Sequence, residues 1–195
     1  MPPSLSYLEG STLTCAGLTA WNALYGSTPL APGDIVLTQG TGGVSTFAIK
    51  FAKAAGATVI STTSSAEKGE FLKKLGSDHI INYKETPNWG EEAAKLTPGG
   101  EGVHHILEVG GPATLAQSFK AIRFGGVITI IGFLSAENIE PPSFLEPLLK
   151  LCTVRGILVG NRLQFEEMVG FPFIPFFCLR TRKVCVLTNS LEPSD

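Results

Sequence analysis

Short apolar runs alternate with amphipathic segments along most of this 195-residue chain. None of the apolar runs alternates cleanly between apolar and polar residues, which is typical of strands buried on both faces of a parallel sheet. The runs cover residues 34–39, 57–62, 78–83, 103–109, 126–133 and 153–159. Segments with helical spacing follow the first four runs, at residues 44–55, 66–76, 89–96 and 112–123. The alternation predicts an α/β fold, a doubly wound parallel six-stranded sheet with helices on both faces.

Changes in composition predict the domain organisation. Residues 1–33 hold a helix-like segment and a connector rich in proline and glycine, and residues 34–169 hold the alternating strands and helices. Residues 170–195 form an atypical tail rich in phenylalanine and proline, with no strand-helix period. Glycines at the expected helix ends are predicted to terminate three of the helices; they are Gly56, Gly76 and Gly125.

The composition is that of an ordinary soluble globular protein, with 44% hydrophobic residues, 16% charged residues and a net charge of -2. There is no basic surplus to hold nucleic acid or an anionic membrane, so neither is expected as a partner. The cysteines Cys15, Cys152, Cys178 and Cys185 show no metal-ligand or disulfide spacing, which favours a reducing compartment. The N-terminus has no secretory signal pattern, and the longest apolar stretch is too short for a membrane helix, so a cytoplasmic location is expected.

A glycine-rich turn lies between the first apolar run and the first helical segment. It reads G-x-G-x-x-S, with Ser45 at the third position of a dinucleotide-binding fingerprint. The first glycine allows a tight turn, the second admits a pyrophosphate, and the following helix directs its free N–H groups at the phosphates. A plain structural turn is the alternative, but the flanking strand and helix favour a Rossmann-type phosphate site made by Gly40, Thr41, Gly42, Gly43 and Val44.

The end of the second strand bears on the choice of dinucleotide. An NAD site carries an acidic residue there for the ribose hydroxyls, whereas this chain offers hydroxyl side chains and no acid before Glu67. Ser64, Ser65 and Lys68 are predicted to bind a 2′-phosphate, so NADP(H) is preferred over NAD(H). The alternative for Lys68 is a solvated lysine at the start of a helix.

Several motifs in fixed order resemble the cofactor domain of the medium-chain dehydrogenase/reductases, the zinc-type alcohol dehydrogenase and quinone oxidoreductase superfamily. They are LTCAGLTAWNAL, GDIVLTQGTGGVSTFAIKFAKAAGATVI, LGSDHIINY, GVHHILEVGG and FGGVITIIGF, within residues 11–169. The resemblance implies that Thr19 contacts the nicotinamide and that Lys68 and Tyr83 bind the 2′-phosphate. It also implies that the ends of the fourth and fifth strands line the nicotinamide side of the cleft, through Val109, Gly110, Gly132, Phe133 and Leu134.

Cys15 matches a catalytic zinc ligand of the zinc-containing members. The further ligands come from a GroES-like catalytic domain that this sequence does not contain, and one thiolate cannot make a zinc site, so no zinc is expected. Cys15 is instead predicted to be a small buried residue. For His79, His104 and His105, packing or surface exposure is favoured over catalysis.

Relatives in this superfamily transfer a hydride between nicotinamide and a small molecule. Without the catalytic domain, no catalytic residue is assigned, and the expected function is dinucleotide binding with weak or no turnover; a small-molecule substrate would bind only if that domain is supplied. A non-enzymatic NADP(H)-binding or interaction module is the alternative, while the missing acid argues against a methyltransferase. The last strand, near residues 152–159, is a candidate for pairing with its twin in a homodimer.

Overall fold

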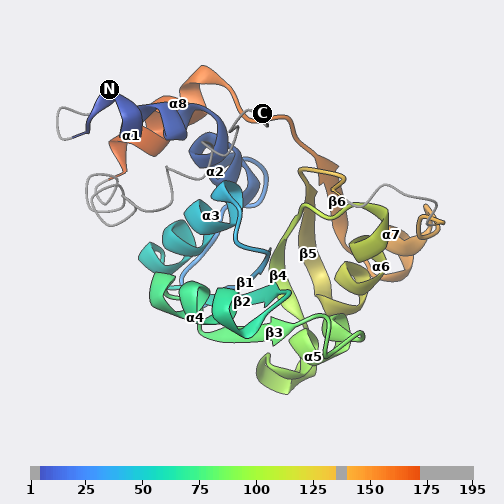
Figure 1. The fold of residues 1–195 in the computed structure, drawn as a ribbon. Helices are drawn as coiled ribbons and strands as arrows, with labels where there is room; N and C mark the ends of the chain where they lie inside the picture. The colour runs from blue at the N-terminus through green and yellow to red at the C-terminus, as the bar shows by residue number, and fades with distance from the viewer. Residues whose placement is uncertain (1–4, 135–139, 172–195) are drawn as a thin grey trace, which may run out of the picture.

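Six parallel strands form one sheet in the order β3-β2-β1-β4-β5-β6 (Figure 1). A computed structural model describes residues 5–134 and 140–171, so the tail expected beyond residue 171 lies outside the described residues. The strands are β1 (Ile35–Gln39), β2 (Thr58–Thr63), β3 (His79–Asn82), β4 (Val103–Glu108), β5 (Ile122–Ile130) and β6 (Thr153–Gly156). All five strand pairings are parallel, and the predicted doubly wound α/β fold is confirmed.

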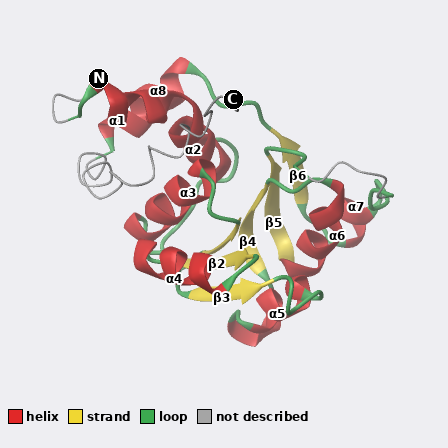
Figure 2. Ribbon diagram, viewed as in Figure 1, coloured by secondary structure: helices red, strands yellow, loops and turns green. Residues whose placement is uncertain are grey.

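Helices cover both faces of the sheet (Figure 2). The helices on the first face are α1 (Tyr7–Thr12), η1 (a π-helix, Leu13–Gly17), α2 (Leu18–Tyr25), α3 (Gly43–Ala54), α4 (Ala66–Leu75) and α8 (Arg162–Gly170). The remaining helices are α5 (Trp89–Lys95), η2 (a 3-10 turn, Pro98–Gly100), α6 (Pro112–Ala121) and α7 (Glu146–Leu149). The helices α5 and α6 pack on the opposite face from α2 and α3 (Figure 1).

Each face of the sheet has its own apolar core. Along β1, Val36 belongs to the core beneath α2 and α3, whereas Ile35 and Leu37 belong to the core beneath α5 and α6. Side chains of a strand point alternately to the two faces, so a strand covered on both sides has apolar residues facing both cores rather than a polar face. This packing explains why the strand sequences lack a polar face.

The strand order reverses direction next to β1. The chain moves outward from β1 to β2 and β3, and then returns to place β4 on the other side of β1. The loops that follow β1 and β4 therefore leave the sheet in opposite directions and open a crevice at the carboxyl ends of these strands. Ligands of doubly wound folds bind in this crevice.

The fifth strand begins earlier than its apolar run predicts. Helix α6 ends at Ala121 and β5 begins at Ile122, so Gly125 is not a helix terminator but lies within the strand. The register shifts from Val103 opposite Ile122 to His105 opposite Val127, and Gly125 has a φ of 74° at this irregularity. The other two glycines do follow helices: Gly76 caps α4 in the left-handed conformation, and Gly56 follows the cap of α3.

The N-terminal helix α2 is bound to the last strand and the last described helix by a polar cluster around Asn22. The Asn22 amide donates to the carbonyl oxygen of Val159 at 2.8 Å. Its side-chain oxygen accepts from Arg155 at 2.7 Å and from Gln164 at 3.0 Å. Segments more than 130 residues apart are thereby joined.

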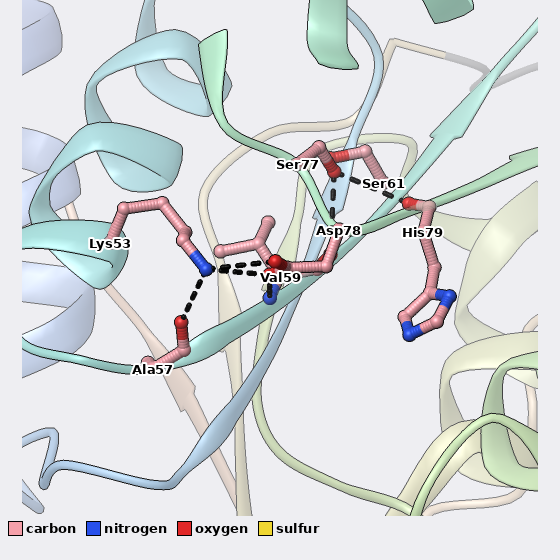
Figure 3. Close-up of polar contacts among 7 residues, drawn as sticks. All are labelled: Lys53, Ala57, Val59, Ser61, Ser77, Asp78 and His79. Atoms are coloured by element: carbon pink, nitrogen blue, oxygen red, sulfur yellow. Dashed lines mark hydrogen bonds and ion pairs between the residues drawn. The ribbon is translucent and has the colours of Figure 1, made fainter.

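A second polar cluster fixes the amino ends of β2 and β3 (Figure 3). The Lys53 ammonium donates to both carboxylate oxygens of Asp78, at 2.8 and 2.9 Å, and to the carbonyl oxygen of Ala57 at 3.2 Å. The backbone N–H of Val59 donates to the same carboxylate at 2.7 Å. Burial acts to raise the pKa of Asp78, but the hydrogen bonds from Lys53 and Val59 outweigh it and hold the pKa below its usual value.

Candidate dinucleotide-binding site

The predicted glycine turn connects the carboxyl end of β1 to the first residue of α3. Gly40 has a φ of 73°, a left-handed conformation that glycine adopts at little cost, and its N–H donates to the Thr62 carbonyl at 2.8 Å. Gly42 precedes the helix in an extended conformation and offers no side-chain cap. A β-carbon at either glycine would meet no heavy atom of the described residues within 4 Å, whereas one on Gly43 would lie 3.1 Å from the Ala16 Cβ. The first N–H groups of α3 have no intrahelical acceptor, and no described side chain caps them.

Ser45 replaces the third glycine of the fingerprint without moving the helix off the sheet. Its side chain is buried, and its hydroxyl donates to the carbonyl oxygen of Gln39 at 2.7 Å. This hydrogen bond ties the first turn of α3 directly to the last residue of β1. A serine at this position thus serves the close contact of helix and strand that glycine serves in the fingerprint.

A cleft of about 590 Å³ opens at the carboxyl ends of the central strands. Five residues predicted to bind the cofactor line it: Gly40, Tyr83, Val109, Gly110 and Leu134. The other lining residues were not predicted from the sequence; they are Gln39, Thr62, Pro87, Trp89, Ala113, Thr114 and Gln117. The cleft has the size range of small-molecule and cofactor sites, and its lining combines apolar and aromatic side chains with a few polar groups.

The residues predicted for the 2′-phosphate lie around the start of α4. Ser65 is the N-cap, and its hydroxyl accepts from the backbone N–H of Lys68 at 3.3 Å. Lys68 is exposed, and within the described part of the chain its ammonium makes no ion pair with a carboxylate. Ser64 is half-buried just after β2, and Tyr83 follows β3, with its N–H donating to the Thr63 carbonyl at 3.0 Å.

Ten of the fifteen predicted positions lie outside the lining of the cleft. Besides Thr41, Gly42, Gly43 and Val44 of the glycine turn and Ser64, Ser65 and Lys68 near α4, they are Thr19, Gly132 and Phe133. Thr19 is buried, and its hydroxyl donates to the carbonyl oxygen of Cys15 at 2.7 Å within the N-terminal helical segment. Gly132 and Phe133 lie in the turn after β5, where the Phe133 side chain is 77% exposed. This turn contacts the turn after β4, because the N–H of Leu134 donates to the Val109 carbonyl at 3.3 Å.

The prediction that Cys15 is buried is wrong. Cys15 is exposed, whereas Leu13 and Gly17 of the same π-helix are buried against the core. Leu13 and Gly17, two residues before and two residues after Cys15, take the core-facing side of the helix, so the thiol faces outward. Among residues 5–134 and 140–171, no three His, Cys, Asp or Glu side chains gather as a metal site. Cys15 therefore has no partner ligands among the described residues, and no chemical step is assigned to a metal.

The histidines of β4 lie near the amino ends of the parallel strands, whereas the glycine turn lies at the carboxyl end of β1. The His104 Nδ1 accepts from the Ile35 N–H at 3.0 Å, and Asp34 lies 3.4 Å from His104 and 3.7 Å from His105. Burial lowers the pKa of His104 and of His105 below the usual value, although the Asp34 carboxylate opposes the shift. Burial thus disfavours the charged form of both imidazoles, and neither histidine lines the cleft.

The strand order, the switch point beside β1 and the uncapped glycine turn together define a nicotinamide dinucleotide-binding fold of the Rossmann class. Residues 43–172 match the zinc-binding dehydrogenase family, and the chain belongs to that family. No helix in the described part of the chain is long and apolar enough to cross a membrane.

Known relatives extend well beyond the region that they share with this chain. A zinc-type alcohol dehydrogenase-like protein of Schizosaccharomyces pombe is 45% identical over all of this chain and 55% of its own length. A solved structure from Sinorhizobium meliloti 1021, provisionally assigned as an alcohol dehydrogenase, is 48% identical with a TM-score of 0.79 over 87% of this chain and 49% of its own. Escherichia coli quinone oxidoreductase has the same fold, with 24% identity and a TM-score of 0.79 over 91% of this chain and 56% of its own. The chain thus spans about half the length of the curated relatives that it matches.

Proposed function

We propose that this chain binds NADP(H) as the cofactor-binding part of an oxidoreductase related to alcohol dehydrogenases and quinone reductases. The observation that carries the proposal is the glycine turn before α3. No described side chain caps the first N–H groups of the helix. The turn before it is also uncrowded, because β-carbons on Gly40 and Gly42 would have no described heavy atom within 4 Å. A pyrophosphate is the ligand that such a helix N-terminus attracts, because both the free N–H groups and the helix dipole favour a negative charge.

The preference for NADP(H) over NAD(H) rests on the residues around the start of α4. The hydroxyl groups of Ser64 and Ser65 and the exposed ammonium of Lys68 are available for a 2′-phosphate, and Tyr83 supplies a further hydroxyl from the neighbouring loop. The nearest acid along the chain, Glu67, is on the exposed surface of α4 rather than at the end of β2. A lysine and hydroxyl groups favour a phosphate monoester, whereas ribose hydroxyls are held by a carboxylate. Escherichia coli quinone oxidoreductase was solved with NADPH.

The bound nicotinamide would supply hydride transfer, and the residues of this chain would bind and orient it. The α3 N-terminus would hold the pyrophosphate, while Val109, Gly110 and Leu134 would form a wall of the cleft. Within the described residues the lining of the cleft holds no carboxylate or imidazole, and we propose that the Tyr83 hydroxyl binds the 2′-phosphate, so we assign no proton donor for the hydride transfer. We therefore propose that these residues bind the cofactor and that turnover requires groups supplied from elsewhere.

A non-enzymatic NADP(H)-binding module is the second candidate. It would bind the cofactor through the same glycine turn and would consume no NADPH with any quinone or aldehyde. A panel of quinones and aldehydes, incubated with the protein and NADPH and followed at the nicotinamide absorbance, separates the two candidates. Consumption well above the background without protein would contradict the proposal that turnover needs further groups.

The experiment for cofactor choice is a fluorescence titration of the purified chain with NADPH and with NADH. We expect NADPH to bind more tightly and Lys68→Ala to remove most of the difference, since it removes the charge facing the 2′-phosphate. Lys74→Ala is the matched control, because Lys74 is an equally exposed lysine near the other end of α4. Equal affinities of the wild-type protein for both dinucleotides would refute the preference, while failure to bind either would refute the proposed function.

We further propose a cytoplasmic location and a homodimer that forms through β6. This strand is the last in the sheet, and within the described residues only β5 pairs with it. An open strand edge favours pairing with a second copy of the same strand. Light scattering after size exclusion should then give twice the 20.7 kDa mass of one chain, and the mass of one chain would contradict the dimer.

A further inference from the structure

Two polar side chains are buried directly beneath the cleft, at the ends of the two strands that flank the switch point. Gln39 is the last residue of β1 and is 6% exposed, and Glu108 is the last residue of β4 and is fully buried. The Gln39 amide nitrogen donates to a Glu108 carboxylate oxygen at 2.8 Å. A buried carboxylate is costly unless donors surround it, so this pair needs an explanation.

The donors around Glu108 come from the turn before α6, from α6 itself and from β1. One carboxylate oxygen accepts from the N–H groups of Gly110 and Gly111, at 2.9 and 3.1 Å, and from the Thr114 hydroxyl. The other accepts from the Ser118 hydroxyl as well as from Gln39. The carboxylate therefore occupies the N-terminus of α6 as an internal anion.

Gln39 completes the arrangement from the other strand. Its side-chain oxygen accepts from the N–H groups of Val109 and Gly110, at 3.0 and 3.2 Å. The three N–H groups of the turn at residues 109–111 are thus all bound by these two side chains. The turn at residues 109–111 also packs closely against the turn after β5. A β-carbon on Gly111 would lie only 2.9 Å from the Phe133 Cα.

We propose that Gln39 and Glu108 are positioning residues for the dinucleotide. They fix the turn at residues 109–111 as a wall of the cleft, and they occupy the N–H groups at the α6 N-terminus. The cofactor phosphates are therefore directed to α3, whose first N–H groups remain free. This proposal rests on the proposed function, because it concerns how the same cleft holds NADP(H).

The partnership of the two side chains is tested by exchanging them. In Glu108→Gln, the new amide N–H₂ group points at other hydrogen-bond donors whichever way the amide is turned. In Gln39→Glu, two carboxylates face each other. In the double variant Gln39→Glu/Glu108→Gln, each hydrogen-bond donor of the cluster again faces an acceptor. The carboxylate at position 39 accepts from the turn, from Ser118 and from the amide at position 108, whose oxygen accepts from Gly110, Gly111 and Thr114. The net charge is unchanged by the exchange.

We expect each single variant to raise the Kd for NADPH at least about tenfold, and the double variant to return it to within about threefold of wild type. Thr38→Val is the matched control. It removes the buried hydrogen bond of 2.8 Å between Thr38 and Ser61, one residue before Gln39, without touching the turn. Its melting temperature should fall while its Kd stays within about twofold of wild type.

Folded single variants that bind NADPH as tightly as wild type would overturn the positioning proposal and leave the proposed function intact. A double variant as weak as the single variants would also overturn it. A wild-type chain that binds no dinucleotide would overturn both proposals.

Amide hydrogen exchange of the ¹⁵N-labelled wild-type protein gives a second test that needs no variant. The amides of Val109, Gly110 and Gly111 should exchange slowly before NADPH is added and gain little protection afterwards. The amides of Gly43 and Val44 should gain protection of about tenfold or more on binding. Fast exchange at residues 109–111 in the free protein would overturn the proposal.

Discussion

Gly42→Ala should separate the stability of the fold from its affinity for the dinucleotide. Gly42 has φ and ψ of -68° and 169°, a conformation that alanine adopts without strain, and a β-carbon there would meet no heavy atom within 4 Å. An unstrained replacement of glycine by alanine stabilises by about 0.4–1 kcal/mol, because it restricts the unfolded chain. For a domain of this size, that change raises the melting temperature by about 1–4 °C.

The same methyl group would occupy the space through which a pyrophosphate approaches the N-terminus of α3. Losing one charge-assisted hydrogen bond to the phosphate costs about 1.5–3 kcal/mol, which corresponds to a rise in Kd of about 10- to 150-fold. Differential scanning fluorimetry and NADPH fluorescence titration measure the two effects on the same protein sample. We expect the melting temperature to rise or hold while the affinity falls.

Gly170→Ala is the matched control, since a β-carbon on Gly170 would likewise meet no described heavy atom within 4 Å and its backbone is not left-handed, while Gly170 ends α8 far along the chain from the turn. It should leave the Kd for NADPH unchanged. If Gly42→Ala bound NADPH as tightly as Gly170→Ala, the phosphate would not lie over this turn and the reasoning from its geometry would be refuted.

Three further predictions concern stability. Asp78→Ala should lower the free energy of unfolding by about 1–2 kcal/mol in urea titration. Most of the loss arises because the N–H of Val59 loses its acceptor, since the partly exposed ion pair with Lys53 adds little. An unchanged urea midpoint would contradict this prediction. Asn22→Ala should cost about 1–3 kcal/mol by removing its side-chain hydrogen bonds, whereas Asn88→Ala, at an N-cap position that makes no side-chain bond, should cost less. Burial lowers the pKa of His105 in the folded state below the usual 6.5, so the unfolded chain binds more protons than the folded chain at acidic pH. The contribution of neutral His105 to stability should be complete above about pH 6.5 and should fall as the pH drops toward 5. His105→Leu should weaken this pH dependence in thermal melts.

The strands and the turn between β1 and α3 could be predicted because their causes are local. A strand buried on both faces shows apolar residues without a polar face, and a tight turn from a strand into a helix is marked by residues such as Gly40 and Gly42. The start of β5 could not be predicted from such patterns. The bulge opposite Val103 draws Ile122 into the sheet before Gly125, and only the pairing with β4 decides that register.

The candidate site was predicted where glycines and a known motif mark it, and missed where side chains from distant segments meet. Trp89, Gln117 and Gln39 line the cleft because α5, α6 and β1 converge there, and no spacing in the sequence expresses that convergence. Cys15 was predicted to be buried from residue type alone, whereas the helix phase set by Leu13 and Gly17 turns it outward. Glu108 at the end of an apolar run was the one signal of the buried pair, since a carboxylate there requires internal donors.

The cluster around Asn22 has a consequence for how the chain is made. Helix α2 finds its hydrogen-bond partners at Arg155, Val159 and Gln164, which are synthesised 133 to 142 residues later. Chains emerge at roughly 5–20 residues per second, so the side chain of Asn22 stays without these partners for on the order of ten seconds, although the apolar face of α2 can pack on α3 much sooner. During synthesis, the contact between α2 and residues 155–164 can therefore form only after strands β1 to β5 have been made.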